Sequence, residues 1–397
     1  MELFGQIVVW IIMACALVGC FASIIKEGSE LGNQFLEGIN SIGSIFLPVG
    51  GIMAAAPFLT AFVKSVFGPL YALVGADPAM AATTFIAVDM GGYQLAEALA
   101  ATKESWIMAM MTGYMAGATI VFSIPVALKM LQKSDRRYLA MGTMAGFIMI
   151  PVGVLVSSAI IALTDPAIRE VIATSGPATY QLALSWGQIF INLIPLIVIC
   201  GLIAVGLYFI PEGMIKGFNV FGKFMDSALR IVFVVCVVEY FTGVFSSIFG
   251  TWGFEPLIAD DVDYNRALET SGYIGIMLCG AFPMVYLIKT YLARPLGWLG
   301  RKVGLSADAT AGILAATANV LALFGIVKDL KEEDKVKCIA YSVCCAFLIG
   351  DHLAFTANFQ PTLILPVMLG KLAAGILSVW LATKFVIPKV LYASKKA

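Results

Sequence analysis

A few ionisable side chains lie inside otherwise apolar stretches of this sequence, and they could bind a small cation. Asp89 precedes a pair of glycines, while Asp351 and His352 are adjacent in another apolar run. A charged group at the centre of a membrane helix costs about 2.5–3.5 kcal/mol on insertion scales, so each one needs a reason to be there. A carboxylate can act as the counter-ion of a cationic substrate. His352, which is the only histidine, can contact substrate or a proton.

Each of these groups also has a structural interpretation. Asp89 can cap a helix by accepting hydrogen bonds from backbone N–H groups, and both roles can hold together. Asp351 can form an ion pair with Lys371, which lies in the next apolar segment. His352 can be a hydrogen-bonded residue of the core. Glu239 is interpreted as a contact between helices or subunits.

Polar and aromatic residues near these groups complete the candidate site. Two glycines after Asp89 allow a sharp reversal of the chain, and aromatic faces attract an ammonium group, with on the order of 2 kcal/mol when desolvated. The expected substrate-binding residues are Asp89, Gly91, Gly92, Tyr93, Gln94, Thr119, Phe122, Ser123, Asn319, Asp351, His352 and Phe355.

The composition is that of a membrane protein. Of the 397 residues, 60% are hydrophobic and 13% are charged, whereas a soluble domain is about half apolar and a quarter charged. The formal net charge is zero, which suggests no nucleic-acid partner. Apolar segments lie near 5–25, 42–63, 79–100, 106–128, 138–163, 184–210, 227–250, 271–288, 308–327, 338–358 and 362–387. All are expected to be helical, because lipid offers backbone groups no other partner.

The first apolar segment and the cysteines have simple interpretations. Residues 1–6 contain Glu2 and no basic residue, unlike the start of a signal peptide, so we expect an uncleaved first span. The eight cysteines form no C-x-x-C motif and are expected to be small packing residues, with no metal and no cofactor.

The distribution of basic residues between the loops indicates that some segments turn back inside the membrane. If all eleven segments cross, the two sides carry 11 and 12 loop basic residues, which contradicts the positive-inside rule. If 79–100 and 308–327 enter and leave on one side, 19 lie inside and four outside. The four are Lys64, Lys103, Arg169 and Arg266. Turning back 308–327 alone gives the same division, so charge does not decide about 79–100.

An internal repeat decides this point. Residues 41–163 resemble residues 271–388. The matching positions are Pro57 with Pro283, Pro69 with Pro295, Asp89 with Asn319, Gly117 with Gly350 and Phe122 with Phe355. The sequence therefore predicts one all-α transmembrane domain over 1–397, with about nine full spans and two re-entrant hairpins. The two copies have inverted topology, as in many secondary transporters. The intervening segments, 184–250, are expected to form a scaffold and an interface between subunits.

At these residues the sequence resembles the EutH family, the ethanolamine permeases of the bacterial ethanolamine-utilization system. The matching stretches are Asp89-Met90-Gly91-Gly92, 119–128, 134–140, 209–218, Gly350-Asp351-His352-Leu353 and 368–372. The resemblance implies uptake of ethanolamine across the bacterial cytoplasmic membrane. From their positions, Asp89 could hold its ammonium group, and Asn319, Gln94, Thr119 or Ser123 its hydroxyl.

The expected mechanism is alternating access by the hairpins and their partner spans. A channel without ion coupling and a transporter of another small polar solute stay open as alternatives. An enzyme is disfavoured, since the chain has neither H-E-x-x-H nor G-x-S-x-G. The coupling ion is left open, and a homo-oligomer is expected, with a dimer favoured over a trimer.

Overall fold

Most of the described backbone is helical, as the eleven apolar segments predicted. The computed structural model describes residues 1–302 and 305–388. The helices are α1 (Glu2–Ile25), α2 (Glu30–Ala54), α3 (Ala56–Val66), α4 (Gly68–Ala72), α5 (Ala79–Phe85), α6 (Gly92–Leu99), α7 (Lys103–Thr112), α8 (Ile124–Met130), α9 (Arg136–Thr164), α10 (Trp186–Phe209), α11 (Pro211–Thr242), α12 (Val244–Phe249), α13 (Ala267–Lys302), α14 (Ala307–Ala318), α15 (Val320–Ile326), α16 (Glu332–Cys345), α17 (Asp351–Phe359) and α18 (Ile364–Leu381).

Shorter elements join these helices. Two π-helical segments are η2 (Gly113–Ser123) and η6 (Ala382–Val386). The 3-10 turns are η1 (Val88–Met90), η3 (Lys133–Asp135), η4 (Val327–Asp329) and η5 (Pro361–Leu363), and two short antiparallel strands are β1 (Ala167–Ile168) and β2 (Tyr180–Gln181).

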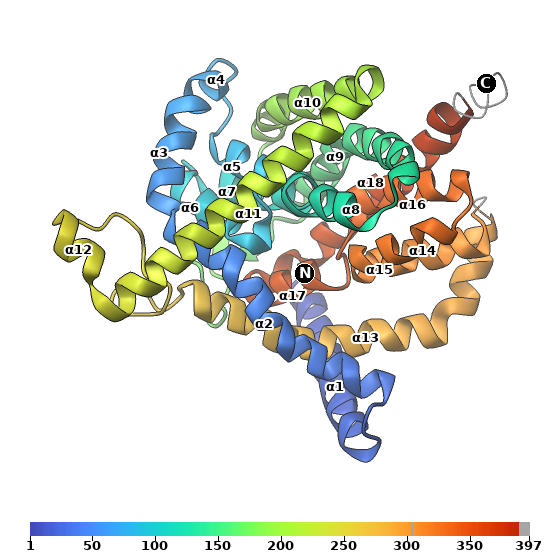
Figure 1. Ribbon diagram of the computed structural model, residues 1–397, viewed down its shortest axis with the longest axis horizontal. Coiled ribbons are helices and arrows are strands. Elements are labelled where there is room, and N and C mark those ends of the chain that lie inside the picture. The colour runs from blue at the N-terminus through green and yellow to red at the C-terminus, as the bar shows by residue number, and fades with distance from the viewer. Residues whose placement is uncertain (303–304, 389–397) are drawn as a thin grey trace.

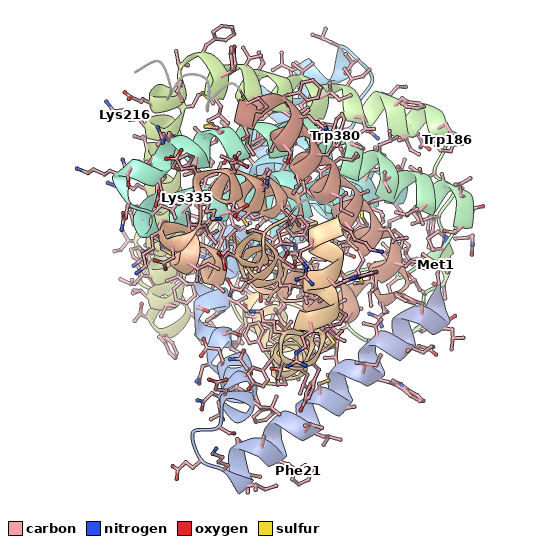
Figure 2. All side chains as sticks on the ribbon, turned by 90° about the vertical axis from the view of Figure 1, so that its right-hand side faces the viewer. Met1, Phe21, Trp186, Lys216, Lys335 and Trp380 are labelled. Carbon is pink, nitrogen blue, oxygen red and sulfur yellow. The ribbon has the colours of Figure 1, made fainter. Side chains whose placement is uncertain are left out.

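Several helices are long and apolar enough to cross a bilayer. Within the described residues they number seven: Glu2–Ile25, Glu30–Ala54, Lys103–Met130, Lys133–Thr164, Trp186–Phe209, Ala267–Leu292 and Pro361–Val386. Their arrangement is seen in Figure 1, and Figure 2 shows α1 running along the edge of the molecule from Met1 toward Phe21. Its Trp10 is 77% exposed, as expected of a side chain that faces lipid. The chain is an all-α polytopic membrane protein.

Two of the predicted segments are helical hairpins. In the first hairpin (79–100), α5 and α6 pack against each other on either side of η1, and Gly91 has a φ of +92°, which favours glycine. In the second hairpin (308–327), α14 and α15 meet at the extended residue Asn319, and Gly312 of α14 lies against Leu323 of α15. The breaks expected at these positions are therefore present in both segments.

Glycines determine how closely each hairpin approaches the segment that follows it. A β-carbon at Gly117 in η2 would overlap the carbonyl oxygen of Ile86, at the end of α5. A β-carbon at Gly350 would likewise overlap the carbonyl oxygen of Ala318, at the end of α14. The two close approaches thus occur at positions that the predicted internal repeat pairs with each other.

We expect Gly117→Ala and Gly350→Ala to destabilise the protein by about 1–3 kcal/mol each, because overpacking forces the backbone to move. Thermal unfolding in detergent, followed by tryptophan fluorescence, measures the change. Gly201→Ala in α10 is the matched control, because a β-carbon there meets nothing within 4 Å. A loss of stability in the control equal to that of the two variants would contradict the prediction.

Two pairs of long helices cross in opposite directions. On α2 and α13, Gly38 lies against Cys279 while Ile42 lies against Gly275, so residue numbers rise along one helix and fall along the other. The second pair, α9 and α18, is close enough for the Ser157 hydroxyl to donate to the Pro366 carbonyl at 3.0 Å. α10 packs on α9 and α11 packs on α2, so each of these two helices contacts one of the pairs.

The structure changes the bounds of several predicted segments. The second one begins at Glu30 rather than near 42, and α11 begins at Pro211, well before 227. Segment 338–358 is not one continuous helix, because α16 ends at Cys345 and α17 begins at Asp351. Between them Phe347 has a φ of +61°, which is a strained conformation for a bulky residue.

The acidic loop before α13 is held by one arginine. Arg266 is largely buried and forms ion pairs with Glu255 at 2.8 Å, Asp260 at 3.3 Å and Asp263 at 3.7 Å. Backbone N–H groups of Asp263 and Val262 hold the pKa of Asp260 below its ordinary value. Arg266 thus holds the acidic residues of this loop together, and the loop has a structural role.

Candidate functional site

A cavity of about 740 Å³ lies where the two hairpins meet α2, α13 and α17. Broken backbone at η1, at Asn319 and between α16 and α17 lines it, which is where membrane proteins tolerate such breaks. Its walls are formed by Asn33, Gln34, Glu37, Asn40, Ser41, Ser44, Ile45, Pro48, Ala87, Asp89, Met90, Ala118, Phe122, Ile274, Phe282, Val285, Lys289, Ala318, Asn319, Leu321, Ala322, Phe347, Asp351 and His352.

Five of the predicted substrate-binding residues line this cavity. They are Asp89, Phe122, Asn319, Asp351 and His352. They come from η1, η2, the second hairpin and the start of α17, which are far apart in the sequence. The fold thus brings together the ionisable groups that were singled out because they lie inside apolar segments.

The two aspartates face the cavity with few partners. The imidazole of His352 lies beside the Asp89 carboxylate, and its Nε2 is 3.9 Å from Asp89 Oδ1. No side chain caps α6, so the helix-cap interpretation of Asp89 is not supported; at the second hairpin Asn319 accepts a hydrogen bond from the Leu321 N–H at 2.8 Å. Asp351 forms no hydrogen bond or ion pair with the residues that the structure describes.

The ion pair predicted between Asp351 and Lys371 is not formed. Lys371 is 1% exposed, and its Nζ donates to the Tyr114 carbonyl at 2.7 Å and contacts His352 Nδ1 at 2.9 Å. Neighbouring residues on a helix point about 100° apart, so Asp351 and His352 cannot both face the lysine. In α17 the histidine faces it and the aspartate faces the cavity.

Aromatic rings hold the imidazole between them. The ring centre of Tyr114 lies 4.9 Å from that of His352, and the ring centre of Phe347 lies 5.4 Å away on another element. Phe347, whose φ is positive, also lines the cavity. His352 is 1% exposed, and within residues 1–302 and 305–388 its Nε2 has no hydrogen-bond partner.

The sequence interpretation missed the polar wall of the cavity. Asn33, Glu37, Asn40 and Ser44 lie on one face of α2, and Lys289 of α13 also lines the cavity. The signal was their helical spacing of four, three and four residues just before the apolar run.

The other seven predicted residues do not line the cavity. Tyr93, Thr119 and Phe355 are buried in packing contacts; the Thr119 hydroxyl donates to the Val343 carbonyl at 2.8 Å, and the Tyr93 hydroxyl accepts from Gln360 at 2.9 Å. The amide of Gln94 and the hydroxyl of Ser123 are buried, and neither has a hydrogen-bond partner among the residues that the structure describes. Gly91 and Gly92 lie in the turn. A β-carbon on Gly91 would contact Ile52, and a β-carbon on Gly92 would overlap the Ala87 carbonyl oxygen.

At the far end of α17 from the cavity, Arg169 ties the chain together. Its guanidinium donates to the carbonyls of Asn358, Phe359, Ala173 and Gly176 at 2.5–3.2 Å. Burial lowers the pKa of Arg169, while these acceptors favour its charged form. The Gln360 side chain accepts from the Arg169 N–H at 3.0 Å and donates to the Tyr93 hydroxyl. This cluster, the Arg169 latch, joins the loop before α10, the end of α17 and the first hairpin.

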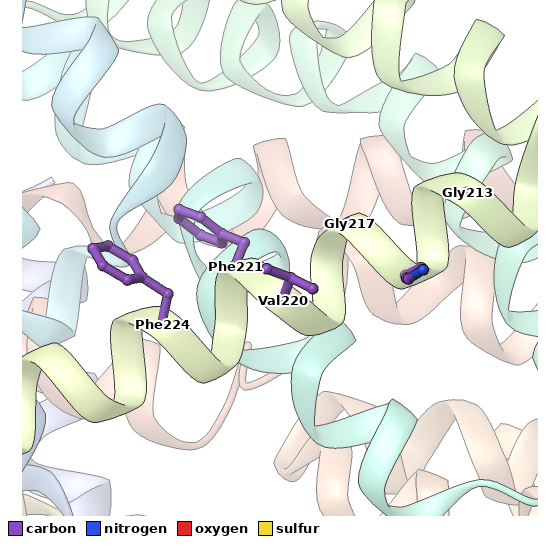
Figure 3. A pocket seen from close by; sticks show the side chains of 6 residues that line it. Gly213, Gly217, Val220, Phe221 and Phe224 are labelled. Atoms are coloured by element: carbon purple, nitrogen blue, oxygen red, sulfur yellow. The ribbon is translucent and has the colours of Figure 1, made fainter.

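A second hollow, of about 580 Å³, lies along α11 (Figure 3). It is lined by Gly213, Lys216, Gly217, Val220, Phe221 and Phe224. Its lining holds a single ionisable side chain and no carboxylate, so it does not suit a cation. The role of 184–250 as a scaffold and as the interface of a homo-oligomer stays a prediction.

Comparison with known proteins assigns the chain to a family. The family model described as "Ethanolamine utilisation protein, EutH" matches residues 4–385. A probable ethanolamine permease of Listeria monocytogenes is 36% identical over 94% of this chain and 92% of its own length. A probable ethanolamine permease of Salmonella typhimurium is 37% identical over 91% of this chain and 86% of its own length.

A third relative, the uncharacterized protein YxeR of Bacillus subtilis, is 32% identical over 93% of this chain and 91% of its own length. No solved structure matches the chain. The resemblance seen in the hairpin and in the Gly350-Asp351-His352 stretch thus extends along nearly the whole sequence, and the chain belongs to the EutH family.

Proposed function

We propose that this protein transports ethanolamine, as its ammonium ion, across the bacterial cytoplasmic membrane. The charge of the cavity is the observation that carries the proposal. Three carboxylates line it, those of Asp89, Asp351 and Glu37, together with Lys289, and one buried cation, Lys371, reaches it through His352. Three negative charges and two positive charges leave one negative charge, which suits one monovalent ammonium. At neutral pH a primary alkylamine is mostly protonated, as a lysine is.

The relatives agree with transport rather than with catalysis. Those most similar in the comparisons carry the name ethanolamine permease, and they align with this chain over most of its length. Asn319 lines the same cavity and offers an amide to the substrate hydroxyl, as does the polar face of α2. The function is therefore that of a permease, and this protein is not an enzyme.

We infer alternating access from equivalent contacts in the two halves. Gly117 matches Gly350 and Phe122 matches Phe355 at a separation of 233 residues, which also matches Tyr114 with Phe347. The ring pair Phe122–Phe347, at 5.7 Å, then has the pair Phe355–Tyr114, at 6.3 Å, as its counterpart, and both are T-shaped. Antiparallel packing of α2 on α13 is what an inverted repeat predicts.

Loops that the charge count assigns to one side contact one another, which supports the second hairpin (308–327) being re-entrant. Arg137 pairs with Glu332, and Lys335 pairs with Asp135, all on the inner side. On the outer side, the Tyr180 hydroxyl donates to Glu104 at 3.0 Å. Glu37 and Lys289 then mark the inner mouth of the cavity, and the Arg169 latch closes the outer end. We propose that the structure is the inward-facing state.

Counterflow in sealed liposomes tests this function against a channel. Liposomes loaded with unlabelled ethanolamine should accumulate labelled ethanolamine transiently, since a carrier exchanges one for the other. An open pore would only equilibrate the label, so the absence of a transient would contradict alternating access.

Competition in the same assay tests the charge argument. Ethylene glycol has the shape of ethanolamine but no ammonium group, so it should not inhibit uptake at concentrations at which unlabelled ethanolamine does. Equal inhibition by the two would show that the carboxylates do not select a cation. Stronger inhibition by another small amine than by unlabelled ethanolamine would favour that amine as the substrate.

A further inference from the structure

His352 is the one cavity group whose proton position follows from its neighbours. Lys371 Nζ lies 2.9 Å from His352 Nδ1 and also donates to the Tyr114 carbonyl. An ammonium group has three donors and no acceptor, so Nδ1 must accept the hydrogen bond. A neutral imidazole then carries its proton on Nε2, which lies on the side of the ring toward Asp89 and the cavity.

That Nε2–H has no hydrogen-bond partner among the described residues. Its nearest acceptor, Asp89 Oδ1, is 3.9 Å away, beyond hydrogen-bond distance. The ring cannot turn to find another partner, because Tyr114 and Phe347 pack on it and Lys371 holds its other nitrogen. A buried donor fixed in this way is costly unless a ligand accepts from it.

We propose that the Nε2–H of His352 donates to the hydroxyl oxygen of the substrate, and that Lys371 sets the tautomer that makes this possible. The inference rests on the proposed function and names the residue that selects an amino alcohol over a plain amine. Asp89 lies beside this donor, so an ammonium at the carboxylates places a hydroxyl two carbons away within reach of the imidazole. Lys371 does not touch substrate and is a positioning residue.

n-Propylamine is the appropriate probe, because it has the ammonium and the size of ethanolamine with a methyl group in place of the hydroxyl. A site with a buried donor rejects such an analogue, since the donor is left unpaired. We expect wild type to bind ethanolamine roughly 10- to 100-fold more tightly than n-propylamine. In His352→Phe this ratio should fall to about threefold or less, mainly because ethanolamine binds more weakly.

Lys371 variants separate positioning from a merely structural role. Lys371→Met frees the imidazole to adopt either tautomer and should lower the ratio, whereas Lys371→Arg keeps a donor that is always charged and should restore much of it. His352→Met, which also lacks an N–H donor, covers the case in which His352→Phe does not fold. An unchanged ratio in the folded one of these two variants and in Lys371→Met would overturn the inference.

The single histidine allows a direct measurement on wild type. In protein labelled with ¹⁵N only at histidine, NMR should report the proton on Nε2, and ethanolamine should shift that resonance more than n-propylamine does. A proton on Nδ1 would overturn the inference even if ethanolamine binds. If wild type binds neither amine, the proposed function itself fails, so the two failures are distinguishable.

Discussion

Liposomes containing Asp89→Asn should take up ethanolamine at least about 30-fold less efficiently than wild type. The substitution keeps the shape of the side chain and removes the charge of one of the two aspartates that face the cavity. Removing one partner of a buried charge pair costs about 2–5 kcal/mol. The two remaining carboxylates would then balance the two lysines, and the net charge of the site would no longer attract an ammonium ion.

Asp351→Asn should lower affinity by a similar factor, because the same charge count applies to either carboxylate. Asp261→Asn, in the exposed loop before α13, is the control and should leave uptake unchanged. Binding of labelled ethanolamine to purified protein separates a loss of affinity from a loss of movement. Wild-type affinity in both Asp89→Asn and Asp351→Asn would remove the basis of the proposed function.

The sequence identified the ionisable groups of the site because burial makes each of them expensive. Asp89, Asp351 and His352 were conspicuous inside apolar runs, and all three line one cavity. Which of them would face Lys371 could not be read from the sequence. The direction of a side chain depends on where a helix begins, and α17 begins at Asp351, in the middle of the predicted segment 338–358.

The polar face of α2 was missed for a related reason. Glu37 and Asn40 precede the apolar run, so a search for uninterrupted apolar residues ends before them. Helical periodicity would have extended the segment back to Glu30, where α2 begins. Polar residues that line a water-filled cavity lower the mean hydropathy of a span, so spans that carry function are the ones whose limits are most often misjudged.

Substitution of Arg169 should have the second-largest effect on transport. It acts at the end of the molecule that the Arg169 latch closes, and not through contacts with the substrate. Its guanidinium holds the last carbonyls of α17 and those of the loop before α10, and hydrogen bonds to a charged group contribute about 1.5–3 kcal/mol. We expect Arg169→Met to raise the rate of backbone amide hydrogen exchange in residues 165–182 and 351–360 by about tenfold or more, because the free energy of local opening falls.

Transport should respond in a way that separates the latch from the binding site. If the Arg169 latch closes the outer end, weakening it shifts the population from the inward-facing state toward an outward-open one, as any change in the relative stability of two states does. Arg169→Met should then slow net uptake several-fold, while His352 and both carboxylates still bind ethanolamine with an intrinsic affinity close to that of wild type. Lys103→Met is the matched control, because Lys103 pairs with Glu97 at 3.1 Å near the same end, where both side chains are about one-third exposed. Such surface pairs contribute little, so this variant should exchange and transport as wild type does. Equal effects of Lys103→Met and Arg169→Met would show that exchange and transport respond to the loss of any charge at this end of the molecule. The Arg169 latch would then have no specific role in closing that end.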